Sequence, residues 1–231
     1  MSPMGYYPVF LEMKDCPCVV VGGGTVAERK VEGLLAAGAR VTVISPELTP
    51  ALAAFKEEGQ LHHVARPYRE GDLEGCEVAV AATDDRAANA KVAADGRSAS
   101  GRIWVNAVDD PTNCDFILPS VIRRGDIVIA ASTGGASPAL ARRLREELEA
   151  FLSEDYGPLA ELLQEVRQEL RSRGIVVDPE TWQRAIDGRL RALLARHRRA
   201  QARAYLLAAL GVEAPVCRTA KPAARATDRE K

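Results

Sequence analysis

The stretch from residue 19 to residue 27, VVVGGGTVA, constrains the fold of this chain more than any other. A short apolar run of strand type ends in three glycines, and a helical pattern begins directly after them. Gly22, Gly24 and Ala27 occupy the marked positions of the dinucleotide fingerprint G-x-G-x-x-A. There, one glycine makes a tight turn, the next admits a pyrophosphate, and the small third residue lets helix and strand pack closely. A glycine turn that binds no nucleotide remains the alternative at this point.

Strand and helix patterns alternate through the first part of the chain. Their lengths are typical of a parallel sheet covered by helices on both faces. The expected strands are residues 18–21, 40–44, 61–65, 78–82, 103–105 and 127–131, and the expected helices are 25–37, 49–58 and 84–98. Residues 6–11 read as a further short strand or arm. The sequence therefore predicts an α/β fold with a Rossmann-type, doubly wound parallel sheet.

The character of the chain changes after Ser132. A helix is expected from residue 137 to about residue 152, because its Ser-Pro start places a capping residue before a proline at the first helical position. Residues 156–210 are helical and charge-rich, and two breaks divide them into two or three helices of a separate module. From residue 211 the chain is rich in Ala, Pro, Arg and Lys, and we expect a disordered tail.

Composition excludes several classes of function. The 31 basic and 32 acidic residues nearly cancel, so no global field favours nucleic acid. No apolar run approaches the ~18 residues of a membrane span, and the N-terminus has no signal-peptide pattern, so we expect no membrane association and a cytoplasmic location. The cysteines and histidines are scattered, and we expect no metal site.

The residues after the second strand bear on the nucleotide. In NAD-binding Rossmann units an Asp or Glu usually ends this strand and binds the adenosine ribose. Here Ser45 stands at that position and Glu47 follows two residues later. Either these two share the contact or the backbone holds the ribose. No arginine follows directly, which favours NAD over NADP.

Polar residues also follow two later strands, at the edge where open α/β sheets bind ligands. Thr83 is placed to line the cofactor crevice, whereas Asp84 and Asp85 are better explained as caps of the next helix. After the following strand we expect Asp109 to face the crevice, where a carboxylate can accept a proton, and Asp110 to make a turn.

A second glycine turn, STGGASP at residues 132–138, leads into a helix. Its hydroxyl and N–H groups can hold an anion such as a carboxylate. Arg142, Arg143 and Arg145 follow on that helix. A solvated helix face explains most of these arginines, and one or two of them are candidates for contact with an acidic substrate.

Six segments together resemble the precorrin-2 dehydrogenases, the first module of sirohaem synthases. They are YPVFL at 7–11, VVGGGTVAERK at 20–30, AATDD at 81–85, NAVDDP at 106–111, FILPS at 116–120 and TGGASP at 133–138. The resemblance extends from about residue 6 to residue 150. A generic Rossmann enzyme is not expected to carry both glycine motifs.

The resemblance implies NAD-dependent oxidation of precorrin-2, a tetrapyrrole, to sirohydrochlorin. The family's catalytic carboxylate matches Asp109, and a family serine near the substrate matches Thr133. The cofactor contacts expected from the residues and the resemblance are Gly22, Gly23, Gly24, Thr25, Val26, Ser45, Pro46, Glu47 and Thr83. The expected substrate contacts are Asn106, Gly134, Gly135, Ser137 and Arg142.

The family also pairs into homodimers through the region after the Rossmann unit. We therefore expect a NAD-binding domain at 1–113, a small α+β dimerisation region at 114–153, a helical module at 154–210 and a tail at 211–231. With no methyltransferase domain, the chain would be the stand-alone form. Some relatives also insert ferrous iron, so a bifunctional dehydrogenase and ferrochelatase is one alternative. A non-catalytic NAD or tetrapyrrole sensor is another.

Overall fold

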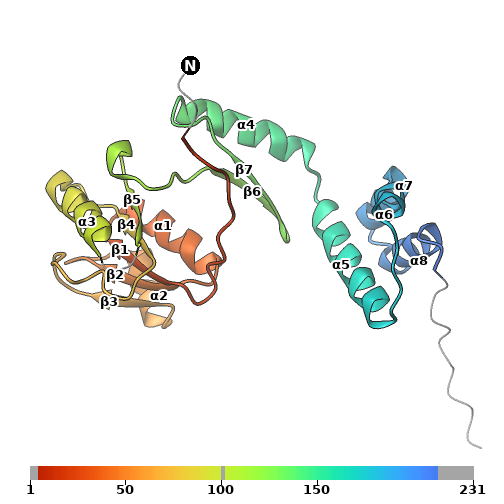
Figure 1. Ribbon diagram of the computed structural model, residues 1–231, viewed down its shortest axis with the longest axis horizontal. Coiled ribbons are helices and arrows are strands. Elements are labelled where there is room, and N and C mark those ends of the chain that lie inside the picture. The colour runs from red at the N-terminus through yellow and green to blue at the C-terminus, as the bar shows by residue number, and fades with distance from the viewer. Residues whose placement is uncertain (1–4, 100–101, 213–231) are drawn as a thin grey trace, which may run out of the picture. The chain divides into compact units, whose positions relative to one another are not determined.

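The computed structural model of the chain describes residues 5–99 and 102–212 (Figure 1). The chain divides into two compact units, residues 1–118 and residues 119–231. Each unit is described by itself.

The first unit is built on a five-stranded parallel sheet in the order β3-β2-β1-β4-β5. Its strands are β1 (Pro17–Val21), β2 (Arg40–Ile44), β3 (Leu61–Val64), β4 (Val78–Ala81) and β5 (Trp104–Ala107). Its helices are α1 (Thr25–Ala36), α2 (Pro50–Glu57) and α3 (Arg86–Ser98), and a 3-10 turn covers Pro111–Asn113. This strand order confirms the Rossmann-type sheet that the alternating pattern predicts (Figure 1).

Both faces of the sheet are buried, because side chains alternate along each strand. Cys18 and Val20 of β1 belong to one apolar cluster, together with Ala27, Val31 and Leu52 from α1 and α2. Val19 and Val21 belong to a second cluster, together with Val92 and Ala93 from α3. Helices on both faces make the sheet doubly wound, as predicted.

Two helix starts in this unit depend on side-chain caps. The Thr49 hydroxyl accepts a hydrogen bond from the Leu52 N–H at 3.3 Å, as expected for the cap of α2. The Asp85 carboxylate accepts from the Ala87 and Ala88 N–H groups at 2.8 and 3.2 Å. Asp85 alone of the adjacent Asp pair is the cap of α3.

The second unit begins with a hairpin. Its strands β6 (Ser120–Arg124) and β7 (Ile127–Ala131) pair antiparallel across a turn at Gly125, where φ is +57°. The strand expected at 127–131 is therefore not part of the parallel sheet, and its partner strand was not predicted. The turn has only two residues, a length that joins antiparallel strands but is too short for a parallel crossover. Helix α4 (Pro138–Phe151) packs against both strands.

Four helices follow, namely α5 (Tyr156–Ser172), α6 (Pro179–Ala185), α7 (Gly188–Ala195) and α8 (Arg199–Ala209). The expectation of two or three helices was wrong, because it used only the breaks at Arg173-Gly174 and Asp178-Pro179 and not those at Asp187-Gly188 and His197. Asp187 caps α7 by accepting from the Leu190 N–H at 2.8 Å, and His197, at φ +56°, follows its end. Fully buried leucines form the core of these helices, among them Leu162, Leu190, Leu206 and Leu207.

Residues 6–11 form neither a strand nor a helix, and most of their large apolar side chains are exposed. The predicted tail lies outside the described residues from residue 213 onward. Among the helices in the described part of the chain, none is long and apolar enough to cross a membrane.

Candidate functional site

The glycine turn after β1 is held in place by its own surroundings. Gly22 has φ +122°, and a Cβ there would overlap the carbonyl of Ala82. A Cβ at Gly23 would overlap the Glu47 carbonyl and lie 2.7 Å from the Ser45 hydroxyl oxygen. These two glycines are therefore required by the backbone packed against them, independently of any ligand.

Gly24 differs from its two neighbours. A Cβ at Gly24 would meet nothing within 4 Å, and the residue is exposed at the start of α1 with φ −86° and ψ −176°. No side chain caps this helix, so the first N–H groups, at Thr25 and Val26, have no partner within it. Open space above unpaired N–H groups at a helix N-terminus fits a pyrophosphate. The open space at Gly24 beside these N–H groups forms a glycine cradle that an anion can enter.

The loop after β2 contains the residues expected near the ribose. Ser45 is buried, its N–H donates to the Val64 carbonyl at 3.2 Å, and its carbonyl contacts the His63 ring nitrogen at 2.9 Å. Pro46 and Glu47 are exposed. Ser45 therefore packs against the glycine turn at Gly23. Of the two residues expected to contact the ribose, Glu47 is the one that a ligand can reach.

A brace between α1 and this loop was not predicted. The Thr49 hydroxyl donates to the Glu28 carboxylate at 2.6 Å, and the Thr49 N–H donates to the Gly23 carbonyl at 2.9 Å. One residue thus caps α2 and fixes both the glycine turn and the first turn of α1. The sequence signal that could have indicated this brace is Glu28, an acidic residue in the first turn of α1, whose N-terminus has no side-chain cap.

Thr83, after β4, is engaged by Asn89 of α3. The Thr83 hydroxyl lies 2.8 Å from the Asn89 side-chain oxygen, and the Asn89 amide donates to the Thr83 carbonyl at 2.9 Å. Asn89 is only 4% exposed. The buried asparagine was not singled out from the sequence, and it fixes Thr83 at the edge of the sheet.

The adjacent carboxylates after β5 have different surroundings. Asp110 accepts from the Thr112 hydroxyl at 2.6 Å and from the Asn113 amide at 2.7 Å, and these bonds hold the pKa of its carboxyl below the usual range. Asp109 is exposed, lies in the left-handed region at φ +57°, and makes no hydrogen bond or ion pair within residues 5–99 and 102–212. The turn therefore occupies Asp110 and leaves Asp109 available.

Asn106 lies at the end of β5 with its side chain turned inward. It is 7% exposed, and its amide donates to the Phe116 carbonyl at 2.9 Å. The Cys114 thiol donates to the Ala107 carbonyl at 3.0 Å, and its burial raises the pKa of the thiol. Both side chains tie residues 108–116 back onto the strand, so Asn106 supports the segment that carries Asp109.

Lys30 of α1 is a further charged group of the first unit. Its side chain is half-buried, and burial and the neighbouring Arg29 lower the pKa of its ammonium. Asp109 and Cys114 act on that pKa in the opposite direction. Lys30 belongs to the Arg-Lys pair that ends the first glycine motif, but sequence reasoning assigned it no role.

The remaining expected residues lie in the second unit. The Thr133 hydroxyl donates to the Ser137 carbonyl at 3.0 Å and accepts from the Ser137 N–H at 3.1 Å, which closes the second glycine turn. Gly134 and Gly135 have φ of +62° and +88° and are exposed, and Ser137 caps α4 by accepting from the Leu140 N–H. The Thr133 hydroxyl is thus used within the turn that presents these glycines.

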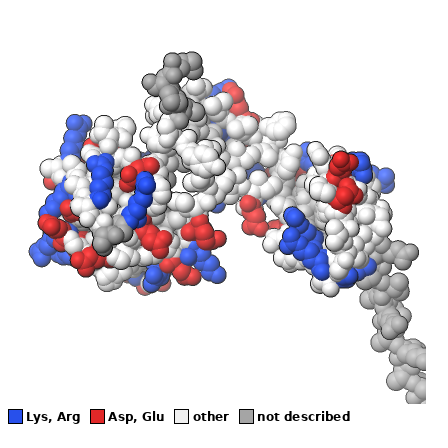
Figure 2. Space-filling model, viewed as in Figure 1, with Lys and Arg blue, Asp and Glu red and all other residues white. Residues whose placement is uncertain are grey.

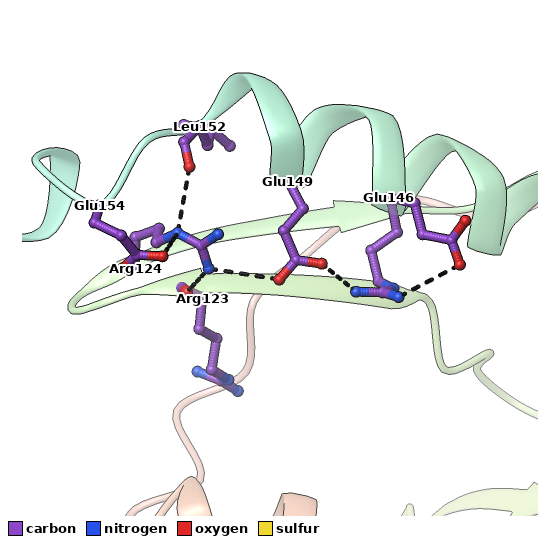
Figure 3. A network of polar contacts seen from close by, with 7 residues as sticks. Arg123, Arg124, Glu146, Glu149, Leu152 and Glu154 are labelled. Atoms are coloured by element: carbon purple, nitrogen blue, oxygen red, sulfur yellow. Dashed lines mark hydrogen bonds and ion pairs between the residues drawn. The ribbon is translucent and has the colours of Figure 1, made fainter.

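The arginines of the second unit separate into paired and unpaired groups. Arg124 donates to the Leu152 carbonyl at 3.3 Å and forms ion pairs with Glu149 and Glu154 at 3.5 and 3.3 Å (Figure 3). Figure 3 shows the Arg123 side chain pointing away from this network. Arg143 and Arg145 pair with glutamates of their own helix, as a solvated face would.

Arg123 and Arg142 form no ion pair with any described residue.

Acidic and basic side chains are interspersed over the face of the first unit that Figure 2 shows, in keeping with the balanced charge of the sequence. Within the described ranges, no three His, Cys, Asp or Glu side chains form a group that could hold a metal ion.

Comparison with known proteins matches two family models to this chain. Residues 9–120 match a model described as putative NAD(P)-binding, and residues 124–150 match one described as sirohaem biosynthesis protein central. The chain is also similar to the solved structure of SirC, a precorrin-2 dehydrogenase, with a TM-score of 0.71 and 30% identity. That similarity covers 85% of this chain and 98% of SirC.

The chain belongs to the precorrin-2 dehydrogenase family. Among curated relatives, the siroheme synthase of Thioalkalivibrio sulfidiphilus is 42% identical over 211 residues, which cover 90% of this chain and 42% of that protein. The siroheme synthase of Methylococcus capsulatus is 40% identical over 210 residues, covering 89% of this chain and 44% of that protein. The chain thus spans less than half the length of these relatives. In this chain, the glycine cradle after β1 and Asp109 after β5 lie at the carboxyl edge of the same parallel sheet.

Proposed function

We propose that this chain is an NAD-dependent precorrin-2 dehydrogenase that oxidises precorrin-2 to sirohydrochlorin. The observation that carries the proposal is the similarity to SirC over 85% of the chain, spanning both units. The reaction removes one hydride and one proton from the substrate. NAD, when bound, accepts the hydride. The chain must therefore bind the nucleotide, hold the substrate against it and accept the proton.

The first unit supplies the nucleotide site. The N–H groups of Thr25 and Val26, above the open space at Gly24, bind the pyrophosphate. Glu47 lies exposed after β2 and is the carboxylate for the adenosine ribose, whereas buried Ser45 holds the turn. An acidic group in this loop disfavours a 2′-phosphate, which supports NAD over NADP. Thr83, held by Asn89, lines the same edge.

Asp109 is the proton acceptor in this proposal. Its carboxylate is free of internal hydrogen bonds among the described residues, and it follows β5 at the carboxyl edge where ligands of open parallel sheets bind. Asp110 cannot take this role without breaking the bonds from Thr112 and Asn113. The left-handed backbone at Asp109, which costs of order 1 kcal/mol or more for a residue other than glycine, is supported by those bonds.

We further propose that residues of the second unit bind substrate carboxylates. Precorrin-2, the substrate of the family, carries eight carboxylates. Gly135 and the unpaired Arg142 are exposed and suit carboxylates, while the Gly134 N–H donates to the Ser132 hydroxyl at 3.1 Å and Thr133 and Ser137 maintain the turn. Arg124 is excluded from this role because it is engaged by Glu149 and Glu154.

We also propose that residues 114–153 form a homodimer interface. Helix α4 exposes Leu140, Leu144, Leu148 and Phe151 on the spacing of one helix face. An exposed apolar row of this size is typical of a surface covered by a protein partner.

The free thiols of Cys16, Cys18, Cys76 and Cys114 suit a reducing cytoplasm, where we place the enzyme.

Iron insertion is the second candidate activity, because the curated relatives are named siroheme synthases. Purified protein, precorrin-2 and NAD should give NADH and the absorbance of sirohydrochlorin under anaerobic conditions. Parallel reactions with ferrous iron distinguish the activities, since only a chelatase then forms sirohaem faster than a protein-free control. Tight binding of NAD and precorrin-2 without turnover would instead indicate a sensor.

A further inference from the structure

A side chain of α3 hydrogen-bonds the turn that follows β5. The Arg97 guanidinium donates through Nη1 to the Asn113 side-chain oxygen and through Nη2 to the Thr112 carbonyl, both at 3.1 Å. Within residues 5–99 and 102–212, it is the one side chain from outside residues 106–116 that hydrogen-bonds this turn. We propose that Arg97 is a positioning residue for Asp109, which it holds through Asn113 and Asp110. This role rests on the proposed function, in which Asp109 accepts the substrate proton.

Close packing of α3 on β5 brings Arg97 within reach of the turn. Gly96 is buried, and a Cβ there would lie 2.4 Å from a methyl carbon of Val105. Any side chain at this position would push the last turn of α3 away from β5. The Tyr68 hydroxyl donates to the Asp95 carboxylate at 2.8 Å, which also fixes this part of α3. The backbone of Arg97 is therefore held in place, although its side chain is exposed.

Arg97 fixes the orientation of the Asn113 amide. The amide oxygen accepts from Arg97, and the amide nitrogen donates to the Asp110 carboxylate at 2.7 Å. In a flipped amide the oxygen would face that carboxylate, and two acceptors form no hydrogen bond. Arg97 therefore selects the orientation in which Asn113 binds Asp110.

Asp110 in turn holds the backbone next to Asp109. Its carboxylate also accepts from the Thr112 hydroxyl at 2.6 Å, and its carbonyl accepts from the Asn113 N–H at 3.1 Å and from the Cys114 thiol at 3.3 Å. The left-handed backbone of Asp109, at φ +57°, is unfavourable for a residue other than glycine and persists only where its surroundings fix it.

The Asp109 carboxylate depends on this support. It makes no hydrogen bond or ion pair of its own within the described residues, so the backbone of the turn sets its position. A catalytic group that is misplaced by about 1 Å can lose on the order of 10²-fold in rate. A turn without Arg97 would hold the base less rigidly and lower the rate without touching the nucleotide site.

Activity provides the first test. Because Arg97 is exposed and acts through two other residues, Arg97→Met should lower kcat by roughly three- to tenfold, the range of one hydrogen bond, with the KM for NAD unchanged. Arg97→Lys should recover part of the loss, since lysine lacks the guanidinium fork that binds two acceptors. Lys91→Met is the matched control and should match wild type. Lys91 is exposed on the same helix and makes no hydrogen bond or ion pair with any described residue.

A double-mutant cycle tests the path through Asn113. If Arg97 acts by orienting this amide, Asn113→Ala removes the same support, and Arg97→Met should then lower kcat by less than about twofold more. Effects of the two substitutions that simply multiply would overturn the positioning role, and so would a normal kcat in Arg97→Met.

A third measurement needs no turnover. The bonds from Thr112 and Asn113 hold the pKa of the Asp110 carboxyl below its usual range, so a weakened Asn113 bond raises this pKa. In NMR titrations of the full chain, Arg97→Met should raise the Asp110 pKa toward the value in Asn113→Ala, and Lys91→Met should leave it unchanged. An Asp110 pKa that is the same in Arg97→Met and wild type contradicts the role of Arg97. If wild type does not oxidise precorrin-2 while Arg97→Met still raises the Asp110 pKa, the proposed function fails and the support of the turn stands.

Discussion

The three glycines of the first turn should respond differently to substitution. Gly22 sits at φ +122° against the Ala82 carbonyl, whereas Gly24 has an extended backbone and faces open space. A residue with a side chain at Gly22 costs roughly 1–3 kcal/mol in backbone strain. Separating β1 from the Ala82 backbone costs roughly 1–3 kcal/mol more. Gly22→Ala should therefore destabilise the protein by about 3 kcal/mol.

Gly24→Ser is the matched variant. Serine adopts the backbone of this position and is a better helix cap than glycine, so the free energy of unfolding should change by less than about 0.5 kcal/mol. Its side chain, however, fills the space in which a pyrophosphate would approach the Thr25 and Val26 N–H groups. Loss of charge-assisted hydrogen bonds worth roughly 1.5–3 kcal/mol should raise the Kd for NAD about tenfold to a hundredfold.

Two measurements on both variants check this reasoning. Thermal unfolding should show Gly22→Ala melting about 10 °C below wild type, at roughly 4 °C per kcal/mol for a domain of this size, and Gly24→Ser close to wild type. Calorimetric titration with NAD should show weakened binding in Gly24→Ser. Wild-type affinity in a well-folded Gly24→Ser protein would refute the assignment of the cradle.

Three further outcomes follow from the same structure. Asp109→Asn should lower kcat by roughly 10²–10⁴-fold and keep NAD binding, and comparable loss in Asp110→Asn would contradict the assignment of the base. Leu144→Glu on α4 should convert a homodimer to a monomer in analytical ultracentrifugation, and an unchanged mass would place the interface elsewhere. The Arg191 ion pair lowers the pKa of Asp155, so Asp155→Asn should reduce stability above pH ~4, the ordinary range of the group, and this deficit should shrink as the pH falls through the lowered folded-state pKa. Urea unfolding at pH 7 and pH 3 measures the difference.

The parallel sheet could be predicted because its signals are local and repeated. Most of its strands are short, largely buried apolar runs, and α2 and α3 begin at the capping residues Thr49 and Asp85. The hairpin was harder, because β6 has the sequence SVIRR, in which one side chain is buried and arginines follow. The helical module was undercounted because its extra breaks, at Asp187 and His197, depend on a cap and a left-handed residue rather than on proline.

Parts of the site could be predicted where the residue type and its place after a strand are enough to indicate a role. They could not be predicted where the role depends on tertiary contacts. Glycines and carboxylates at strand ends mark the ligand edge of any such sheet. The sequence could not distinguish Gly24, which is open, from Gly23, which is closed by Ser45 and Glu47. It did assign Asp110 to a turn and Asp109 to the crevice, and the hydrogen bonds from Thr112 and Asn113 to Asp110 are the physical reason that Asp110 is held in the turn. Asn89 and the Glu28–Thr49 brace depend on contacts between elements for the same reason.

The central claim is that this chain transfers a hydride from precorrin-2 to NAD. An anaerobic stoichiometric assay of the purified full chain tests it most directly, with NADH and sirohydrochlorin followed by their separate absorbances. The account predicts one NADH formed for each sirohydrochlorin, at a rate that Asp109→Asn reduces sharply. Sirohydrochlorin formed without NADH, or no product from a protein that binds both ligands, would contradict it.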